Sequence, residues 1–270
     1  MPRAWPIPPA ANTLHVVGDT QAVSEGRQAI VLDDMARLTI PDVPYRVQVG
    51  DLVGGRGEPV RFPDAIDLLD SMGSGQWWAC VGNHDYDHVD QDPSPADAAA
   101  SMGMPGLNFT VDLGYAVMIL TYVRAGTSVD PTPYDPAWLD EELARYPDRL
   151  CLIVAHAPLV NSAGDKSPEG DEILAMLANH PQARAWLCGH THWPIDHPEL
   201  LLVLETGDHT IAQINASATY YTIPGFDWTD RLCTTWLTVY DDRLEVRFRD
   251  HGAHQWVDGP GHVRVWSFPL

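Results

Sequence analysis

The stretch VGNHDYDH, Val81 to His88, follows directly on the apolar run WWAC at 77–80. It places one side-chain amide, two imidazoles and two carboxylates where a buried strand would end. In α/β proteins the carboxyl ends of parallel strands form the sheet edge at which sites are built. The stretch therefore indicates one edge of a functional site.

Strand-like and helix-like segments alternate through the first two-thirds of the chain. The strand-like segments are short, apolar and mostly rich in β-formers, as in strands buried on both faces. They lie at 13–17, 45–49, 77–81, 150–155 and 183–188. The helix-like segments lie at about 23–38, 64–72, 136–146 and 169–180, the last with Ser167 as its expected N-cap. This alternation predicts an α/β fold with a largely parallel sheet.

Other segments read as antiparallel strands. Residues 107–123 resemble two strands paired around an Asp-Leu-Gly turn, and the strands after residue 200 include a hairpin that turns at Asp241-Asp242. We expect two sheets that share one core, within a single domain over 1–270. Its motif-bearing core would span 13–193, and a β-rich part at 200–270 would belong to the second sheet. The stretches 85–106 and 124–135 are expected to be long loops, which are often functional.

Composition narrows the class of protein. The chain has 16 basic and 37 acidic residues, a formal net charge of −21, and such a surface repels nucleic acid and anionic membranes. No apolar run approaches the roughly 20 residues of a membrane span, and the N-terminus has no signal-peptide core. We therefore expect a soluble, cytoplasmic protein with neither nucleic acid nor membrane as a partner. The four cysteines form no CxxC pair and are expected to be buried thiols.

Each of the five strand-like segments ends on side chains that can bind metals or move protons. In chain order these are Asp19 and Gln21, then Asp51, then Asn83, His84 and Asp85, then His156, and last His190 and His192. Oxygen and nitrogen donors without a thiolate suit Mn, Fe, Zn, Co or Ni better than a structural zinc. Seven of these residues are candidate ligands, namely Asp19, Gln21, Asp51, Asn83, His156, His190 and His192. Seven are too many for one tetrahedral ion, but suit two ions that share a bridging carboxylate.

The ordered set Asp-x-(His/Gln), Gly-Asp, Gly-Asn-His-Asp, His-x-Pro and Gly-His-x-His resembles the calcineurin-like metallophosphoesterases. The resemblance runs from Asp19 to His192. It implies a four-layer αββα sandwich, in which two mixed β-sheets are flanked by helices. It also implies two divalent or trivalent transition metal ions, drawn from Mn, Fe, Zn, Ni and Co.

The resemblance assigns a role to each site residue. One metal would be held by Asp19, Gln21, Asp51 and His192, and the other by Asn83, His156 and His190, with Asp51 bridging the two. A hydroxide between the ions would attack phosphorus, and His84 would act as the general acid toward the leaving oxygen.

The resemblance thus implies a phosphoester hydrolase acting on a small molecule, with a lean to phosphomonoesters. The alternatives are a phosphodiesterase, including cyclic-nucleotide types, and, with low weight, a non-catalytic scaffold on the same fold. The motifs alone do not separate monoesterase from diesterase.

Two positions depart from the family pattern. Many relatives have His where this chain has Gln21. The side-chain amide of Gln21 is a weaker metal ligand than imidazole. The alternative is that Gln21 is a turn residue that binds no metal. Many also have an acid or amide at the position of Gly54, where it steadies the catalytic histidine. Asp85 is then the candidate to orient His84. Tyr86 is expected on the loop surface, and His15 and His180 are expected to be ordinary structural residues.

Overall fold

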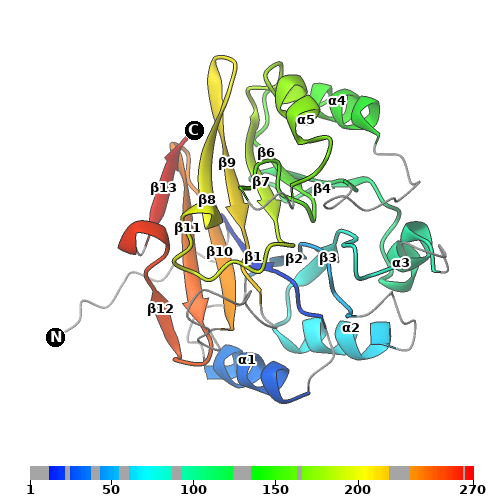
Figure 1. Cartoon of the computed structure of the whole chain (residues 1–270), viewed down its shortest axis with the longest axis vertical. Helices are drawn as coiled ribbons and strands as arrows, with labels where there is room; N and C mark the ends of the chain where they lie inside the picture. Colours follow the sequence, from blue (N-terminus) through cyan, green and yellow to red (C-terminus); the bar gives the residue numbers. More distant parts are fainter. Residues whose placement is uncertain are drawn as a thin grey trace.

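Two β-sheets lie face to face, with helices on their outer sides (Figure 1). The computed structural model describes residues 12–21, 25–37, 43–54, 61–86, 93–123, 135–162, 166–218, 232–263 and 265–270. The expected loop at 124–135 lies almost wholly outside these ranges. Residues 87–92, which include His88, also lie outside them.

One sheet has seven strands in the described part of the chain, and it contains both the first and the last of the described strands. Its strands are β1 (Thr13–Val17), β2 (Tyr45–Gln48), β3 (Gln76–Ala79), β10 (Cys233–Val239), β11 (Arg243–Asp250), β12 (Gln255–Val257) and β13 (Trp266–Pro269). Their order is β12-β11-β10-β1-β2-β3, with β13 also paired to β11. Strands β1, β2 and β3 are parallel, whereas β10 pairs antiparallel with β1. The C-terminal strands therefore complete the sheet that β1 begins.

The other sheet has six strands among the residues that the structure describes. They are β4 (Phe109–Asp112), β5 (Val117–Leu120), β6 (Cys151–Val154), β7 (Ala183–Cys188), β8 (Leu201–Thr206) and β9 (His209–Asn215), in the order β4-β5-β6-β7-β9-β8. The expectation that the strands after residue 200 are antiparallel is wrong for one pairing, because β9 runs parallel to β7. The β8–β9 hairpin places β8 at the sheet edge and turns β9 back into the direction of β7.

The described ranges contain five helices, which cover the outer faces (Figure 1). They are α1 (Glu25–Arg37), α2 (Phe62–Ser71), α3 (Pro95–Ser101), α4 (Pro136–Ala144) and α5 (Gly170–Leu177). Short 3₁₀ turns occur at Pro198–Leu200 and Pro260–His262. Side chains of α4 and α5 pack against the six-stranded sheet, and those of α1, α2 and α3 share a core with the seven-stranded sheet. With the third core between the sheets, the predicted α/β sandwich of two mixed sheets is confirmed.

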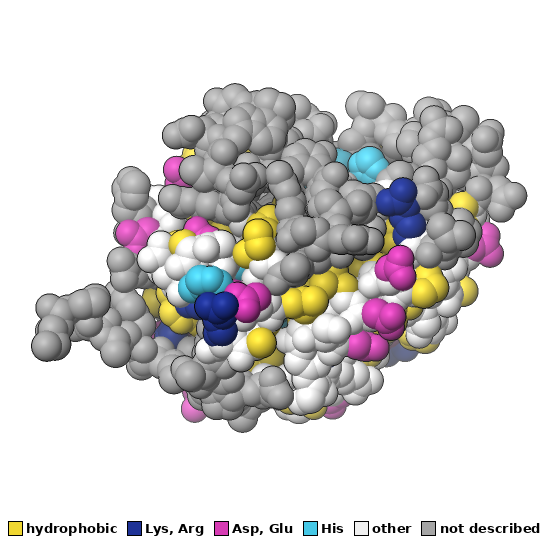
Figure 2. Space-filling model, turned by 90° about the horizontal axis from the view of Figure 1, so that it is seen from below, with side chains coloured by type: hydrophobic (Ala, Val, Ile, Leu, Met, Phe, Trp, Pro, Cys, Tyr) yellow, Lys and Arg dark blue, Asp and Glu magenta, His cyan; other side chains and the backbone are white. Residues whose placement is uncertain are grey.

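Helix α2 illustrates how the sequence determines one of these layers. Its buried residues recur at three- and four-residue spacing and are Phe62, Ala65, Leu68 and Leu69. The acids between them, Asp64, Asp67 and Asp70, are exposed. A helix with this pattern buries one apolar stripe and solvates the other face. Figure 2, which views the molecule from the side of α1 and α2, shows acidic side chains scattered over this face.

The structure corrects two local predictions. The stretch 85–106, expected to be a loop, contains helix α3, which begins with a capping box between Ser94 and Asp97. Ser167 was expected to cap the helix at 169–180, but α5 begins one residue after its N-cap, Glu169. The Ser167 hydroxyl instead pairs with the side chain and backbone of Glu169 in the preceding turn.

Helix α1 is fastened to the sheet by a buried carboxylate. Asp34 is fully buried and accepts hydrogen bonds from Nε and Nη2 of Arg249 at 2.8 and 2.7 Å. The Nδ1 atoms of His251 and His254 each lie 2.8 Å from its oxygens. Buried charges are stable only when paired in this way, so this cluster sets the position of α1 on strand β11.

Candidate metal centre

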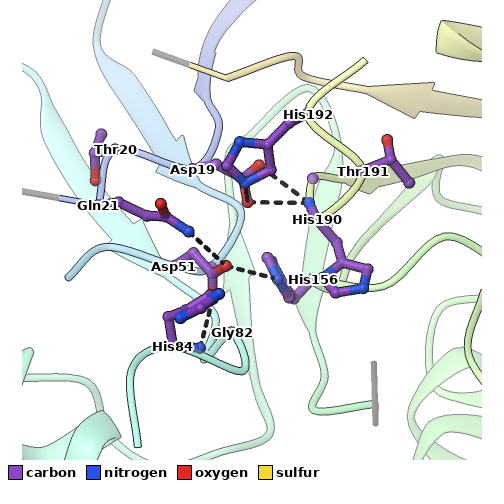
Figure 3. A network of polar contacts seen from close by, with 12 residues as sticks. Asp19, Thr20, Gln21, Asp51, Gly82, His84, His156, His190, Thr191 and His192 are labelled. Atoms are coloured by element: carbon purple, nitrogen blue, oxygen red, sulfur yellow. Dashed lines mark hydrogen bonds and ion pairs between the residues drawn. The ribbon is translucent and has the colours of Figure 1, made fainter. Parts of the chain in front are cut away.

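The candidate site residues come from loops at one edge of the two sheets. Asp19 and Gln21 follow β1, Asp51 follows β2, and Asn83 with His84 follows β3. His156 follows β6, and His190 and His192 follow β7 in the other sheet. Figure 3 shows side chains from both sheets that converge on one region, namely those of Asp19, Gln21, Asp51, His84, His156, His190 and His192. The geometry expected from the strand ends is therefore present.

Within the described ranges, two groups of possible ligand atoms meet at this edge. The ligand atoms of Asp51, His156 and His190 all lie within 4.8 Å of one another, and so do those of Asp19, Asp51 and His192. Asp51 belongs to both groups. A carboxylate has two oxygens and can face two cations at once, so this arrangement suits a pair of ions that share Asp51.

Asp19 connects the first and last loops of the site. The backbone amide of His190 donates to its Oδ1 and Oδ2 at 3.1 and 3.0 Å. The Nε2 atom of His192 lies 3.3 Å from Oδ1 of the same carboxylate. Asp19 is fully buried. Its carboxylate both holds the loop that carries His190 and faces the His192 ring.

The contacts of His156 are those of a metal-ligating imidazole. Its Nδ1 atom lies 2.9 Å from the carbonyl oxygen of Val49. Its Nε2 atom lies 3.3 Å from Oδ2 of Asp51 and 3.0 Å from Oδ1 of Asn83. A ligand histidine usually donates its other ring N–H to a carbonyl or carboxylate, which fixes the ring. The Nε2 atom therefore points toward the side-chain oxygens of Asp51 and Asn83, which are also candidate metal ligands.

The backbone at the site is strained. Among the described residues, seven non-glycine residues have a clearly positive φ, and five of them are candidate ligands. These are Asp19 (33°), Gln21 (36°), Asp51 (55°), His190 (71°) and His192 (49°). Each left-handed residue costs on the order of 1–3 kcal/mol and persists only where its surroundings enforce it. Strain concentrated on the candidate ligands supports a functional role for this edge.

Glycines allow the loops to approach one another. A Cβ atom on Gly82 would clash with Oδ1 of Asp51, and one on Gly189 would clash with Oδ2 of Asp19. Real Cβ atoms do not come so close to other atoms, so any larger residue would displace a candidate ligand. The glycines before Asn83 and His190 are therefore part of the site.

Burial and charge oppose each other at the centre. Burial alone would raise the pKa of Asp51, but the His156 imidazole outweighs it and holds that pKa well below its usual range. Burial would lower the pKa of His156, yet the Asp51 carboxylate raises it to about 10. Burial, reinforced by His156, lowers the pKa of His190 to about 4. Carboxylates this deeply buried require positive charge beside them, and a metal cation meets that requirement.

Gln21 lies beside Asp51. Its side chain is buried, its backbone N–H donates to the carbonyl of Asp51 at 2.9 Å, and its Nε2 lies 3.3 Å from Oδ2 of Asp51. The amide oxygen would be the metal-binding atom, and a rotation of the terminal amide by about 180° exchanges it with the nitrogen. Whether Gln21 is a ligand or a turn residue stays a prediction.

His84 is placed by its backbone. Its N–H donates to Oδ1 of Asp51 at 2.8 Å, and its side chain is partly exposed. Figure 3 shows the His84 imidazole beside the carboxylate of Asp51.

Asp85 has a different set of contacts from the one expected. Its two oxygens accept backbone N–H groups from Asp51, Gly82 and Val53 at 2.9, 2.8 and 3.0 Å. Burial, reinforced by Asp51, raises its pKa to about 7. Because both oxygens are engaged with backbone amides, Asp85 braces the loops that carry Asp51 and Asn83. Its predicted role in orienting the His84 ring finds no support in these contacts.

The remaining residues with a predicted position are Tyr86, His15, His180 and the four cysteines. Tyr86 is buried, with its hydroxyl 3.0 Å from that of Tyr122, so its expected place on the loop surface is wrong. His15 is a buried strand residue stacked on Trp236, with ring centroids 4.5 Å apart. His180 contacts Asp140 of α4 at 2.7 Å. All four cysteines are buried.

Two buried amides that the sequence reading passed over support the ligand loops. Oε1 of Gln213 accepts the N–H groups of Leu159 and Val160, in the loop after His156. Nδ2 of Asn215 donates to the carbonyl of Gly189 and the hydroxyl of Thr191. Both residues lie in β9, two positions apart, and alternate polar residues in an otherwise apolar strand were the available signal.

The fold and the paired carboxylate–imidazole groups define an α/β protein with a candidate two-metal centre. A sequence model described as calcineurin-like phosphoesterase matches residues 13–194. The chain belongs to this family, and the predicted resemblance is confirmed.

One curated relative matches the chain at low sequence identity. An uncharacterised protein of Bacillus subtilis (strain 168), YvnB, is 25% identical over 209 residues, which cover 69% of this chain. The match spans only 16% of YvnB.

Solved structures share the fold at low sequence identity. The purple acid phosphatase PPD1 from yellow lupin (Lupinus luteus) has a TM-score of 0.66 at 14% identity, over 96% of this chain and 53% of PPD1. A dimetal phosphatase from Danio rerio has a TM-score of 0.61 at 15% identity, over 96% of this chain and 99% of that one. GAP50 of Plasmodium, described as the anchor in the inner membrane complex, has a TM-score of 0.60 at 12% identity, over 96% of this chain and 88% of GAP50. Among the described residues, no helix is long and apolar enough to cross a membrane.

Proposed function

We propose that this chain is a dinuclear metal-dependent phosphoester hydrolase. The observation that carries the proposal is the position of Asp51, which belongs to two groups of ligand atoms, each within 4.8 Å. Membership of the calcineurin-like phosphoesterase family supports it. The donor set also supports it, since carboxylate, amide and imidazole groups suit Mn, Fe, Zn, Ni or Co.

The ligand roles follow the two groups. Asp19, Gln21, Asp51 and His192 would hold one ion. Asn83, His156 and His190, with Asp51, would hold the other. Two bound cations would supply the positive charge that phosphoryl oxygens need. They would also lower the pKa of a bound water molecule toward neutral pH. This local charge is what allows a chain of net charge −21 to take an anionic substrate.

His84 would serve as general acid. Its backbone is tied to Asp51, so its position is fixed relative to the ligand groups, while its ring is partly exposed. Asn83 and His84 lie in the turn that follows β3, and Oδ1 of Asn83 lies 3.0 Å from Nε2 of His156, so Asn83 is the neighbour that faces this candidate ligand. A protonated His84 imidazole would donate its proton to the oxygen that leaves phosphorus.

The substrate class is the finer part of the proposal. We favour small-molecule phosphomonoesters over phosphodiesters, including cyclic nucleotides, and we expect neither nucleic acid nor membranes as partners because of the acidic surface. A cytoplasmic location belongs to the same proposal. The principal alternative from another class is a scaffold on this fold. The complete set of candidate ligands argues against it, because a scaffold has no need to keep strained, buried carboxylates and imidazoles together.

The test is a panel of phosphoesters assayed with metal-stripped protein reconstituted separately with Mn, Ni, Zn and Fe. The panel should include alkyl and aryl phosphomonoesters, a linear diester and a cyclic nucleotide. Hydrolysis that depends on added metal would support the proposal, and the preferred ester would decide the substrate class. Protein that binds two ions and hydrolyses none of the esters would favour the scaffold.

A further inference from the structure

The end of β9 lies beside the end of β7, where the loop with His190 and His192 begins. The two strands are parallel, and Cys188 pairs in register with Asn215. Because of this register, the side chain of Asn215 reaches the loop that follows Cys188. Asn215 is about 200 positions from Asp19 in sequence, yet both side chains make hydrogen bonds to the same loop.

Asn215 uses its amide fully. Its Nδ2 group donates to the carbonyl oxygen of Gly189 and to Oγ1 of Thr191, both at 2.7 Å. Its Oδ1 atom accepts the backbone N–H of Ser217 at 3.0 Å. The side chain is buried, so water cannot readily replace these bonds. The two donor bonds fall on the residues that immediately precede His190 and His192.

The loop needs such support because its two histidines have left-handed backbone. His190 has a φ of 71° and His192 a φ of 49°. The candidate ligand groups include both imidazoles, whereas Thr191 between them points away from the cluster (Figure 3). A hydroxyl anchored at Thr191 therefore holds the middle of the strained segment and fixes the direction of both neighbours.

We propose that Asn215 is a positioning residue for the metal centre, which acts through Gly189 and Thr191 to hold the imidazoles of His190 and His192 in ligand geometry. The inference rests on the proposed function, since it takes both histidines to be ligands. Only a side chain with two N–H donors can satisfy both acceptors. Leucine has a similar size but no donor, and aspartate presents oxygens to the Gly189 carbonyl.

The experiment is a titration of metal-free protein with Co²⁺, followed by the visible absorption of the bound ion. It compares wild type with Asn215→Leu, Thr191→Val and Thr191→Ser. Thr191→Val removes only the hydroxyl acceptor, and Thr191→Ser keeps it. Thr238→Val is the matched control, because Thr238 makes a buried hydroxyl contact of 2.9 Å with Thr13 in the seven-stranded sheet. Thermal unfolding of each metal-free variant reports its stability.

Supporting residues around metal ligands typically change metal affinity by about 10–100-fold. We expect Asn215→Leu and Thr191→Val to weaken Co²⁺ binding by roughly this factor and to change its absorption spectrum. Thr191→Ser and Thr238→Val should bind Co²⁺ as wild type does. If Asn215→Leu fails to fold, the comparison of Thr191→Val with Thr191→Ser decides the question.

Two results would overturn the proposal. One is Co²⁺ affinity within about twofold of wild type in both Asn215→Leu and Thr191→Val, since supporting residues usually change affinity by 10-fold or more. The other is an equal loss of affinity in Thr238→Val, which would show a general effect of lost stability. Wild type that binds Co²⁺ but hydrolyses no phosphoester would refute the proposed function and leave this result standing.

Discussion

The backbone amide of His84 donates a hydrogen bond to Oδ1 of Asp51 at 2.8 Å. The other oxygen of Asp51, Oδ2, faces Nε2 of His156 at 3.3 Å. Asp51 is therefore tied to the candidate general acid through one oxygen and to a candidate ligand through the other. Because His84 makes its bond through the backbone, a change of its side chain leaves this link in place. The two residues can be tested separately.

Asp51→Asn should reduce metal content and hydrolysis together. The substitution keeps the shape of the side chain but removes its charge, and Asp51 belongs to both ligand groups. The loss of metal affinity should exceed the roughly 10–100-fold typical of supporting residues. Elemental analysis of loaded protein and hydrolysis assays on the same sample measure both effects. Asp64→Asn, a change at an exposed position of α2, serves as control, and near-normal activity of Asp51→Asn would remove its bridging role.

Gln21→Ala should weaken one ion more than the other. Gln21 lies against Asp51 and in the predicted ligand group of Asp19 and His192. Excess metal should restore part of the rate, and Gln21→His should tighten binding, because imidazole is a stronger ligand for these ions than an amide oxygen. Metal titration of each variant, read by activity and by bound metal, makes the measurement. Unchanged titration curves in both variants would show that Gln21 is a turn residue.

The candidate ligands could be predicted from sequence because their signal is local. Each follows a recognisable buried strand, and parallel strands deliver their carboxyl ends to the same edge. The role of Asn215 could not be predicted this way, because it depends on β9 lying parallel to β7, and the hairpin made antiparallel pairing the simpler expectation. The contacts of Asp85 depend likewise on how three separate loops meet.

A different reason explains why helix α3 was not predicted from the sequence. Its capping box, Ser94 and Asp97, is visible in the sequence. The surrounding prolines and acids favour a loop, and the helix has only seven residues. Its burial against the core of α2 supplies the stability that local propensity does not.

Asp34→Asn should destabilise the fold in a pH-dependent way. Burial alone would raise the pKa of Asp34, but hydrogen bonds from Arg249, His251 and His254 outweigh it and hold that pKa well below its usual range. A carboxyl group with a lowered folded pKa stabilises the protein above its unfolded pKa of about 3.9, and the stabilisation is lost as the pH falls toward the folded value. At pH 7 the variant should lose about 3–5 kcal/mol, as when one partner of a buried pair is removed.

The measurement is urea unfolding of wild type and variant from about pH 7 down to pH 2, across the titration range of aspartate. The difference between them should shrink below about pH 4, because wild type then loses the same contribution. Asp33→Asn, one residue earlier and exposed beside Arg37, removes the same charge and should cost no more than about 1 kcal/mol. A difference that stays constant over this range would show that the Asp34 charge is not what stabilises α1.

His84→Ala should separate proton transfer from metal binding. The backbone bond to Asp51 survives the substitution, so the variant should keep its fold and both metal ions. General acid catalysis contributes about 10²–10⁴-fold in rate, and most when the leaving oxygen is a strong base. The variant should therefore lose far more activity on an alkyl phosphate than on p-nitrophenyl phosphate, whose leaving group needs little protonation.

Steady-state kinetics on both substrates, with metal analysis of the same preparation, tests this expectation. His209→Ala is a matched control, since His209 begins β9 at the hairpin with β8 and lies in neither ligand group. Equal losses on the two substrates with metals intact would mean that His84 stabilises charge in the transition state without giving up a proton. Loss of a metal ion would make His84 a ligand and would require the second group of Asn83, His156 and His190 to be redrawn around it.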